Sequence, residues 1–193
     1  MYYFMRTKFF GRKDVIMPEG LGNVYHTDVC EACGSCFAKP EPPVKFVMRG
    51  DPCDFYVFWS FIFISDRFKE ILEQLEVTGY KTRPAKVVGW NKSDDSDEID
   101  ALKYHELIVT GRCGFMRDLK GDFIPKCDVC GNHKVLKDPV NGLGFANEDY
   151  DGSDIFVFSN QTNFPIVSDK LKKQLSKAKL SNVKFIPIDT YVF

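Results

Sequence analysis

The sequence predicts an α+β fold in which two related halves meet at a four-cysteine site. The signature Cys-x-x-Cys-Gly occurs twice, at residues 30–34 and 127–131, almost half a chain apart. Each copy precedes a short apolar segment, an amphipathic segment that opens with Ser-Asp, and a further extended segment. Such self-similarity indicates an internal duplication. Each half would consist of a Cys-x-x-Cys-Gly turn, here called a knuckle, followed by a strand, a helix and a second strand.

The two signatures have the spacing of a metal site. A Cys-x-x-Cys turn places two sulfur atoms on one side of a tight loop, and the glycine that follows tolerates the backbone conformation of the turn. Two such knuckles together supply the four thiolates of a tetrahedral zinc site. Because four ligands leave no open position for a substrate, we expect a structural Zn²⁺ in a zinc-ribbon-like site. The expected ligands are Cys30, Cys33, Cys127 and Cys130.

Other residues near the knuckles are alternative ligands. Cys36 extends the first motif, while His26 lies four residues before that motif and His133 three residues after the second. Each could replace a thiolate, and a histidine could instead orient one. Cys53 and Cys113 are interpreted as buried thiols. The odd total of seven cysteines fits a reducing compartment better than a full set of disulfides, with redox-active dithiols as the alternative to a metal.

Length and composition indicate a soluble globular protein. The chain has 193 residues, of which 44% are hydrophobic, enough for one domain or two small interlocked halves. Its longest apolar run, at residues 55–64, is too short to cross a bilayer, and residues 1–6 lack the features of a signal peptide. We therefore expect a cytoplasmic protein with no membrane partner.

The matching segments of the two halves lie at slowly increasing distances along the chain. The offset is 97 residues from Cys30 to Cys127, 100 between the strand-like segments 54–58 and 154–158, and 103 from Ser65 to Ser168. Small insertions in loops explain this drift. The predicted organisation is a first repeat at 1–90, an acidic linker or loop at 91–100 and a second repeat at 101–193, packed as one compact unit.

Both predicted helices have clear start signals. Ser65 and Ser168 are good N-caps, and Asp66 and Asp169 place a negative charge where the helix dipole favours it. Each helix carries an apolar stripe, but Gln174 interrupts the second, which should therefore bury a narrower face. The stripes are Phe68, Ile71, Leu72 and Leu75 in the first helix and Leu171, Leu175 and Ala178 in the second.

Extended segments follow both helices, at residues 80–88 and 183–188. Each contains a proline, Pro84 or Pro187, which has no amide donor. Each segment should therefore lie at a sheet edge or pair only partly. Residues 104–110 alternate well enough to predict one more strand.

The residues between the halves are strongly acidic. The segment 91–100 contains Asp94, Asp95, Asp97 and Glu98. Its simplest interpretation is an exposed, solvated loop or linker. The alternative is a docking patch for a basic partner protein, because complementary charges steer association.

The sequence contains no signature of a known catalytic site, such as a nucleophile elbow, a phosphate-binding loop or an HExxH motif. We therefore expect a protein that is not an enzyme. The formal net charge of -1 gives no general attraction to phosphates, which disfavours nucleic acid as a partner. A zinc-dependent or thiol enzyme stays open as one alternative. The other is a nucleic-acid-binding zinc ribbon, with phosphate contacts from Arg112, Lys120, Lys126 and Lys134.

The paired signatures resemble the bacterial double-CxxCG motif family. The resemblance rests on both CxxCG motifs, on the segment 154–158 and on the Ile-Val-Ser-Asp-Lys sequence at residues 166–170, and it spans most of the chain. Cys36, the complete first copy and the acidic segment depart from the family pattern. Members of that family are regarded as immunity proteins of polymorphic toxin systems. The resemblance thus implies a protein that binds and neutralises a cognate toxin inside the producing cell, without specifying the toxin or the oligomeric state.

Overall fold

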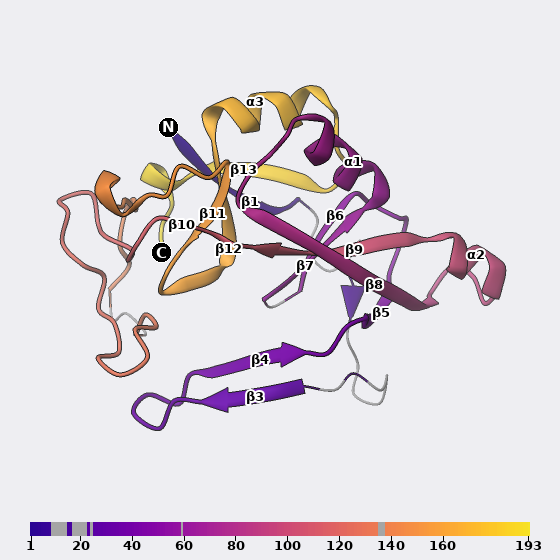
Figure 1. Cartoon of the computed structure of the whole chain (residues 1–193), viewed down its shortest axis with the longest axis horizontal. Coiled ribbons are helices and arrows are strands. Elements are labelled where there is room, and N and C mark those ends of the chain that lie inside the picture. Colours follow the sequence, from indigo (N-terminus) through magenta and orange to yellow (C-terminus); the bar gives the residue numbers. More distant parts are fainter. Residues whose placement is uncertain (9–14, 17–22, 24, 59, 135–137) are drawn as a thin grey trace.

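The computed structural model describes residues 1–8, 15–16, 23, 25–58, 60–134 and 138–193 (Figure 1). These residues form a mixed fold of helices and strands in which strands predominate, which confirms the expected mixture of α and β structure. The strands of the described residues form two sheets and a separate hairpin. Within the same ranges, no helix has the length and apolar character needed to span a membrane.

The larger sheet has six strands. The first helix and the acidic segment form two of the connections between its strands. Helix α1 (Asp66–Gln74) links β7 to β8, and α2 (Ser96–Ala101) links β8 to β9. Strands β5 and β8 are parallel, whereas the other neighbours are antiparallel. The spatial order is β2 (Val15–Ile16), β5 (Val44–Met48), β8 (Tyr80–Trp90), β9 (Lys103–Val109), β7 (Phe61–Ser65) and β6 (Phe55–Phe58).

The smaller sheet has five strands, and helix α3 (Asp169–Lys177) links two of them, β12 and β13. Short 3-10 helices η1 (Asn147–Asp149) and η2 (Ile188–Thr190) precede β11 and follow β13. The spatial order is β10 (Gly111–Arg112), β11 (Ile155–Phe158), β12 (Gln161–Ser168), β1 (Tyr2–Thr7) and β13 (Val183–Pro187). The hairpin of β3 (Tyr25–Val29) and β4 (Cys36–Pro40) joins neither sheet and projects from the body of the molecule (Figure 1).

The two sheets share one arrangement of strands around their helices. In the larger sheet β9 lies between β7 and β8, and in the smaller sheet β1 lies between β12 and β13. The cross-strand partners also correspond: Ser65 with Tyr104 and Pro84 with His105, Ser168 with Tyr2 and Pro187 with Tyr3. The central strand of the smaller sheet therefore comes from the start of the chain, and that of the larger sheet from β9.

Helices α1 and α3 begin where the sequence predicts. The Ser65 Oγ accepts a hydrogen bond from the Phe68 amide at 3.1 Å, and the Ser168 Oγ accepts one from the Leu171 amide at 3.2 Å. Both helices bury apolar side chains in one shared cluster, because α1 and α3 lie side by side (Figure 1). The buried members of this cluster are Met5, Phe55, Ile62, Ile64, Phe68, Leu72, Leu107, Ile155, Val167, Leu171 and Leu175.

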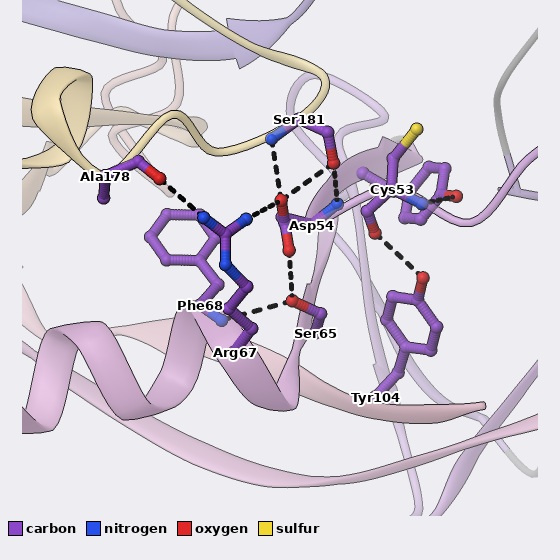
Figure 2. A network of polar contacts seen from close by, with 9 residues as sticks. Cys53, Asp54, Ser65, Arg67, Phe68, Tyr104, Ala178 and Ser181 are labelled. Carbon is purple, nitrogen blue, oxygen red and sulfur yellow. Dashed lines mark hydrogen bonds and ion pairs between the residues drawn. The ribbon is translucent and has the colours of Figure 1, made fainter. Parts of the chain in front are cut away.

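A buried carboxylate joins the start of α1 to the loop after α3 (Figure 2). The Asp54 Oδ2 accepts hydrogen bonds from the Ser181 amide at 2.7 Å and from its hydroxyl at 2.8 Å. The other oxygen accepts from the Ser65 hydroxyl at 2.8 Å, and Arg67 Nη1 lies 3.0 Å from Oδ2. Arg67 also donates to the Ala178 carbonyl at 2.6 Å. The network therefore connects both helices through one side chain.

An equivalent contact joins an aspartate of the smaller sheet to the turn after the helix of the larger sheet. Asp154 precedes β11 as Asp54 precedes β6, and its Oδ2 accepts from the amide and the hydroxyl of Thr78, both at 3.0 Å. In return, the Asp54 amide donates to Ser181 Oγ at 2.8 Å and the Asp154 amide donates to Thr78 Oγ1 at 3.1 Å. Each hairpin thus begins at the turn that follows the helix of the other sheet.

Alanine substitutions of the two N-cap serines, Ser65 and Ser168, distinguish the effect of capping a helix from the effect of a contact with another part of the fold. We expect Ser168→Ala to lower the free energy of unfolding by about 1 kcal/mol, the usual contribution of an N-cap. Ser65→Ala should lower it by about 2 kcal/mol, because the Ser65 hydroxyl also donates to buried Asp54. Urea denaturation of both variants measures the difference, and equal losses would contradict a tertiary role for Ser65.

Two local features differ from the sequence predictions, and a third agrees with them. A hairpin, not a single strand, precedes each helix: Phe58 pairs with Phe61 and Phe158 with Gln161. The segment 91–100, expected to be a linker or loop, contains most of helix α2. The expectation for the two proline-containing segments is met: β13 lies at a sheet edge, and β8 is internal but pairs with β5 only from Ala85 onward, just after Pro84.

Candidate metal centre

The first knuckle is the turn of the β3–β4 hairpin. The Cys30 carbonyl accepts a hydrogen bond from the Gly34 amide at 2.7 Å, and the Cys30 amide donates to the Ser35 carbonyl at 2.9 Å. Gly34 has a φ of 72°, a left-handed conformation that favours glycine. These bonds fold the chain so that the sulfur atoms of Cys30 and Cys33 face the same side.

The second knuckle has the same backbone bonds. The Gly131 amide donates to the Cys127 carbonyl at 2.9 Å, and the Cys127 amide donates to the Asn132 carbonyl at 2.7 Å. Gly131 has a φ of 75°, and Lys126 pairs with His133 around the turn. The repeated motif therefore predicts the local geometry correctly in both places.

The structure brings the four predicted ligands together in one cluster. All four sulfur atoms lie within 4.8 Å of one another, with 4.0 Å between Cys30 and Cys127 and 3.6 Å between Cys33 and Cys130. Four sulfurs around one ion at metal–sulfur distances of about 2.3 Å would lie about 3.8 Å apart. A disulfide would require about 2.05 Å, and all seven cysteines are free. The cluster could therefore hold a metal ion.

A polar contact joins the two knuckles beside the sulfurs. The Asn132 side-chain amide donates to the Ser35 Oγ at 3.0 Å, and these residues follow the glycines at the same position of each motif. Ser35 Oγ also lies 3.1 Å from the Cys33 sulfur. Sequence reasoning missed this pair, although both residues are polar and occupy equivalent places. The contact fixes how one knuckle faces the other.

The surroundings of the sulfurs favour a shared negative charge. Hydrogen bonds from the side chain and the amide of Ser35 lower the pKa of Cys33 to about 6. The amides of Cys130 and Val129 lower the pKa of Cys127 below its usual range. The Asn132 amide also favours a thiolate at Cys130, but desolvation and the neighbouring cysteines outweigh it and raise the pKa of Cys130 to about 11. A cation between the sulfurs would relieve this competition.

The alternative ligands lie outside the cluster. Cys36 is exposed, and Cys53 and Cys113 are buried as interpreted from the sequence. His26 Nε2 lies 2.9 Å from Glu41, while the His133 Nδ1 contacts the Asn160 carbonyl at 3.1 Å. Neither histidine belongs to the group of potential ligands, which consists of the four cysteines.

The acidic residues predicted to bind a partner lie together at the start of α2. Asp95 caps this helix, with its Oδ1 2.8 Å from the Asp97 amide. Asp94, Asp95, Asp97 and Glu98 are all exposed. In Figure 1, α2 lies at the end of the molecule away from the tip of the β3–β4 hairpin. The acidic residues and the cysteines are thus separate sites.

Two of the four basic residues expected in a nucleic-acid interface have partners within the chain. The Arg112 guanidinium donates to the carbonyls of Val109 and Gly111, at 3.1 and 2.8 Å. The Lys126 ammonium lies 4.9 Å from the centre of the Phe115 ring. Contacts of this kind hold side chains against the protein, so this arrangement offers the nucleic-acid alternative no specific support.

No model of a known protein family matches the chain, and none of the curated proteins matches its sequence.

Proposed function

We propose that the four cysteines hold a structural Zn²⁺ ion that ties the two knuckles together. Zinc takes four thiolates in tetrahedral geometry, and the sulfur–sulfur distances of 3.6 and 4.0 Å fit that geometry. Each knuckle supplies only two ligands, so neither can complete the site alone. The ion would supply a cross-link between segments 97 residues apart, with no coordination position left for a substrate.

The proposal includes an internal duplication. Two similarities support it. The strands on either side of β1 pair with it in the same register as the strands on either side of β9, and the two knuckles have the same backbone hydrogen bonds. The reciprocal contacts of Asp54 with Ser181 and of Asp154 with Thr78 give further support, because each joins the same positions of the two copies. Two copies that exchange equivalent contacts resemble a symmetric dimer fused into one chain.

The function that we propose is that of an immunity-type protein, which binds and neutralises a cognate bacterial toxin. The observation that carries this proposal is the convergence of the two CxxCG turns in one site, since those turns are the residues on which the resemblance to the double-CxxCG family rests. A fully thiolate-bound zinc ion is typical of a scaffold that presents a surface. The mechanism would be stoichiometric binding that blocks or inactivates the toxin.

Two exposed regions offer contact surface for such a partner. Val29 and Val129 are 60% and 75% exposed beside the cysteines of their knuckles, and apolar side chains are the usual anchors at the centre of an interface. The acidic start of α2 would attract a basic partner from a distance. In this proposal the exposed valines of the knuckles contribute to the affinity for the partner, and the acidic start of α2 raises the rate of association.

Co-expression tests the proposal directly. The chain is produced in cells together with a toxin-domain protein encoded by the adjacent gene, and growth and complex formation are measured. We expect the chain to restore growth and to co-purify with the toxin. A toxin that remains active in the presence of the folded chain, with no complex on size-exclusion chromatography, would count against an immunity function.

Neutralising the acidic region should slow binding of that toxin. Asp94→Asn, Asp97→Asn and Glu98→Gln are combined, while Asp95 is kept because it caps α2. We expect an association rate about tenfold lower at low salt, since long-range attraction is lost. The control carries Glu70→Gln, Glu148→Gln and Asp189→Asn, which remove the same charge from other exposed positions. Equal association rates of the two variants would show that α2 does not steer the partner.

A further inference from the structure

An open groove of about 320 Å³ lies along the edge of the smaller sheet. Strands β1 and β13 supply most of its lining, and the residue after β1 and a tyrosine after η2 supply the rest. The lining residues are Arg6, Thr7, Lys8, Lys184, Ile186 and Tyr191. The groove lies on a different element from the cysteine knuckles and from helix α2.

Two cations lie next to each other in the lining of this groove. Arg6 and Lys184 are direct partners in the antiparallel pairing of β1 with β13. Side chains in this position lie about 5 Å apart at their Cβ atoms, and like charges placed there repel each other. Neither of the two forms an ion pair with a carboxylate in the part of the chain that the structure describes. The pair therefore carries two uncompensated positive charges at one point.

The Arg6 guanidinium is held in place but incompletely satisfied. Its central carbon lies 3.7 Å from the centre of the Phe164 ring, which orients the guanidinium plane. Its Nη1 atom is buried and has no hydrogen-bond partner among the described residues. A buried donor without a partner destabilises the folded state.

The larger sheet provides an internal comparison. Its strands β8 and β9 have the same register as β13 and β1, and there Lys81 pairs with Ile108. Ile108 thus occupies the position of Arg6, and Lys81 that of Lys184. Because an aliphatic residue suffices at this position in one sheet, the fold does not require a second cation. Arg6 adds charge to the groove without a structural need.

We propose that this groove binds a phosphate group. A phosphate monoester carries a charge of about -1.5 to -2 at neutral pH. This charge balances the two positive charges of one arginine and one lysine better than the single negative charge of a carboxylate would. Arginine also provides planar, paired donors for phosphate oxygens, and lysine adds a point charge. Ile186 and Tyr191 form an apolar wall beside the cations, with the Tyr191 ring 4.9 Å from that of Phe4. Such a wall could contact the organic part of a phosphorylated small molecule.

Two probes distinguish the possible sources of the phosphate. Inorganic phosphate and adenosine monophosphate are each titrated into the complete chain, and backbone amide NMR shifts and the midpoint of thermal unfolding are recorded. Sodium chloride at the same ionic strength is the reference. We expect both probes to shift the amides of β1 and β13 and to raise the midpoint. Tighter binding of the monophosphate would assign the site to phosphate esters, and equal binding would assign it to free phosphate.

Matched variants test the residues. Arg6→Ile introduces the residue that the larger sheet has at this position, and Lys184→Gln removes the opposing charge. Each should weaken phosphate binding about tenfold or more, the effect of losing a hydrogen bond to a charged group. Without phosphate, both should unfold at the same or a higher temperature than the original chain, because a repulsive pair has been removed. Lys81→Gln, at the equivalent position of the larger sheet, should leave binding unchanged.

Responses identical to those with chloride would overturn the proposal. So would undiminished phosphate binding by the folded Arg6→Ile chain, because the cation pair would then have no part in it. A lower unfolding midpoint of Arg6→Ile without phosphate, combined with unchanged binding, would assign Arg6 a purely structural role through Phe164.

Discussion

Replacing Cys30 with serine should abolish metal binding and release the β3–β4 hairpin from the rest of the molecule. The hairpin joins neither sheet, and none of its side chains that the structure describes belongs to a core cluster. Among the described residues, its attachment depends on the cysteine site and on the contact of Ser35 with Asn132. Structural zinc contributes about 10–16 kcal/mol in small zinc-finger peptides, far more than one hydrogen bond. We expect the bound Zn²⁺ to fall from one ion per chain to almost none.

Hydrogen exchange can measure this release strand by strand. In the Cys30→Ser chain, and in the original chain treated with a chelator, the amides of β3 and β4 should lose nearly all protection. The amides of β7, β9, β12 and β1 should keep theirs, because those strands lie in the sheets. Cys36→Ser is the matched control, since Cys36 lies in the same hairpin but outside the sulfur cluster. Full zinc occupancy in Cys30→Ser would falsify the ligand assignment.

Replacing Asp54 with alanine should produce the largest loss of global stability among single polar substitutions in the network of Figure 2. Asp54 is only 7% exposed and accepts hydrogen bonds from Ser65 and from two groups of Ser181. Its removal would leave these donors without their acceptor at a partly buried contact. We expect the free energy of unfolding to fall by about 3 kcal/mol. The contribution of Arg67 is small, because its side chain is 54% exposed.

Asp154→Ala is the control for this substitution. Asp154 makes the equivalent contact with Thr78, but Asp154 is only half-buried and Thr78 is exposed, so water can replace the lost acceptor. A loss of about 1 kcal/mol is expected there. Urea denaturation with an unchanged slope would show that both substitutions act on the native state. Similar losses for the two aspartates would mean that burial of Asp54 is not what gives the network its strength.

The features that the sequence predicted well depend on residues close together in the chain. The N-caps Ser65 and Ser168 act on amides three residues away, so the serine and the following apolar stripe are sufficient to locate each helix. The knuckles are also local, because their bonds join residues within one turn. Their convergence could be predicted because a tetrahedral ion needs four ligands and each turn supplies two.

The features that the sequence did not predict are of two kinds. Some depend on a chain reversal that no glycine or proline marks, and others on the pairing of strands that lie far apart in the sequence. The run 55–64 contains neither glycine nor proline, so nothing marks the reversal between β6 and β7. Helix α2 is short and acidic and has no apolar stripe, although Asp95 is a good cap. The opposition of Arg6 and Lys184 follows only from the pairing of β1 with β13, which no local pattern specifies.

The position of β1 has a consequence for the growing polypeptide on the ribosome. Its side chains contact residues near the other end of the sequence, as in the bond from the Tyr3 hydroxyl to Asp169 and the packing of the Phe4 ring against Tyr191. Phe4 and Met5, both fully buried in the finished protein, are therefore synthesised long before any strand that covers them. Until β12 and β13 emerge, this apolar segment is a target for chaperones or for pairing with another nascent chain. Closure of the smaller sheet around β1 is thus expected to be the last and slowest step of maturation.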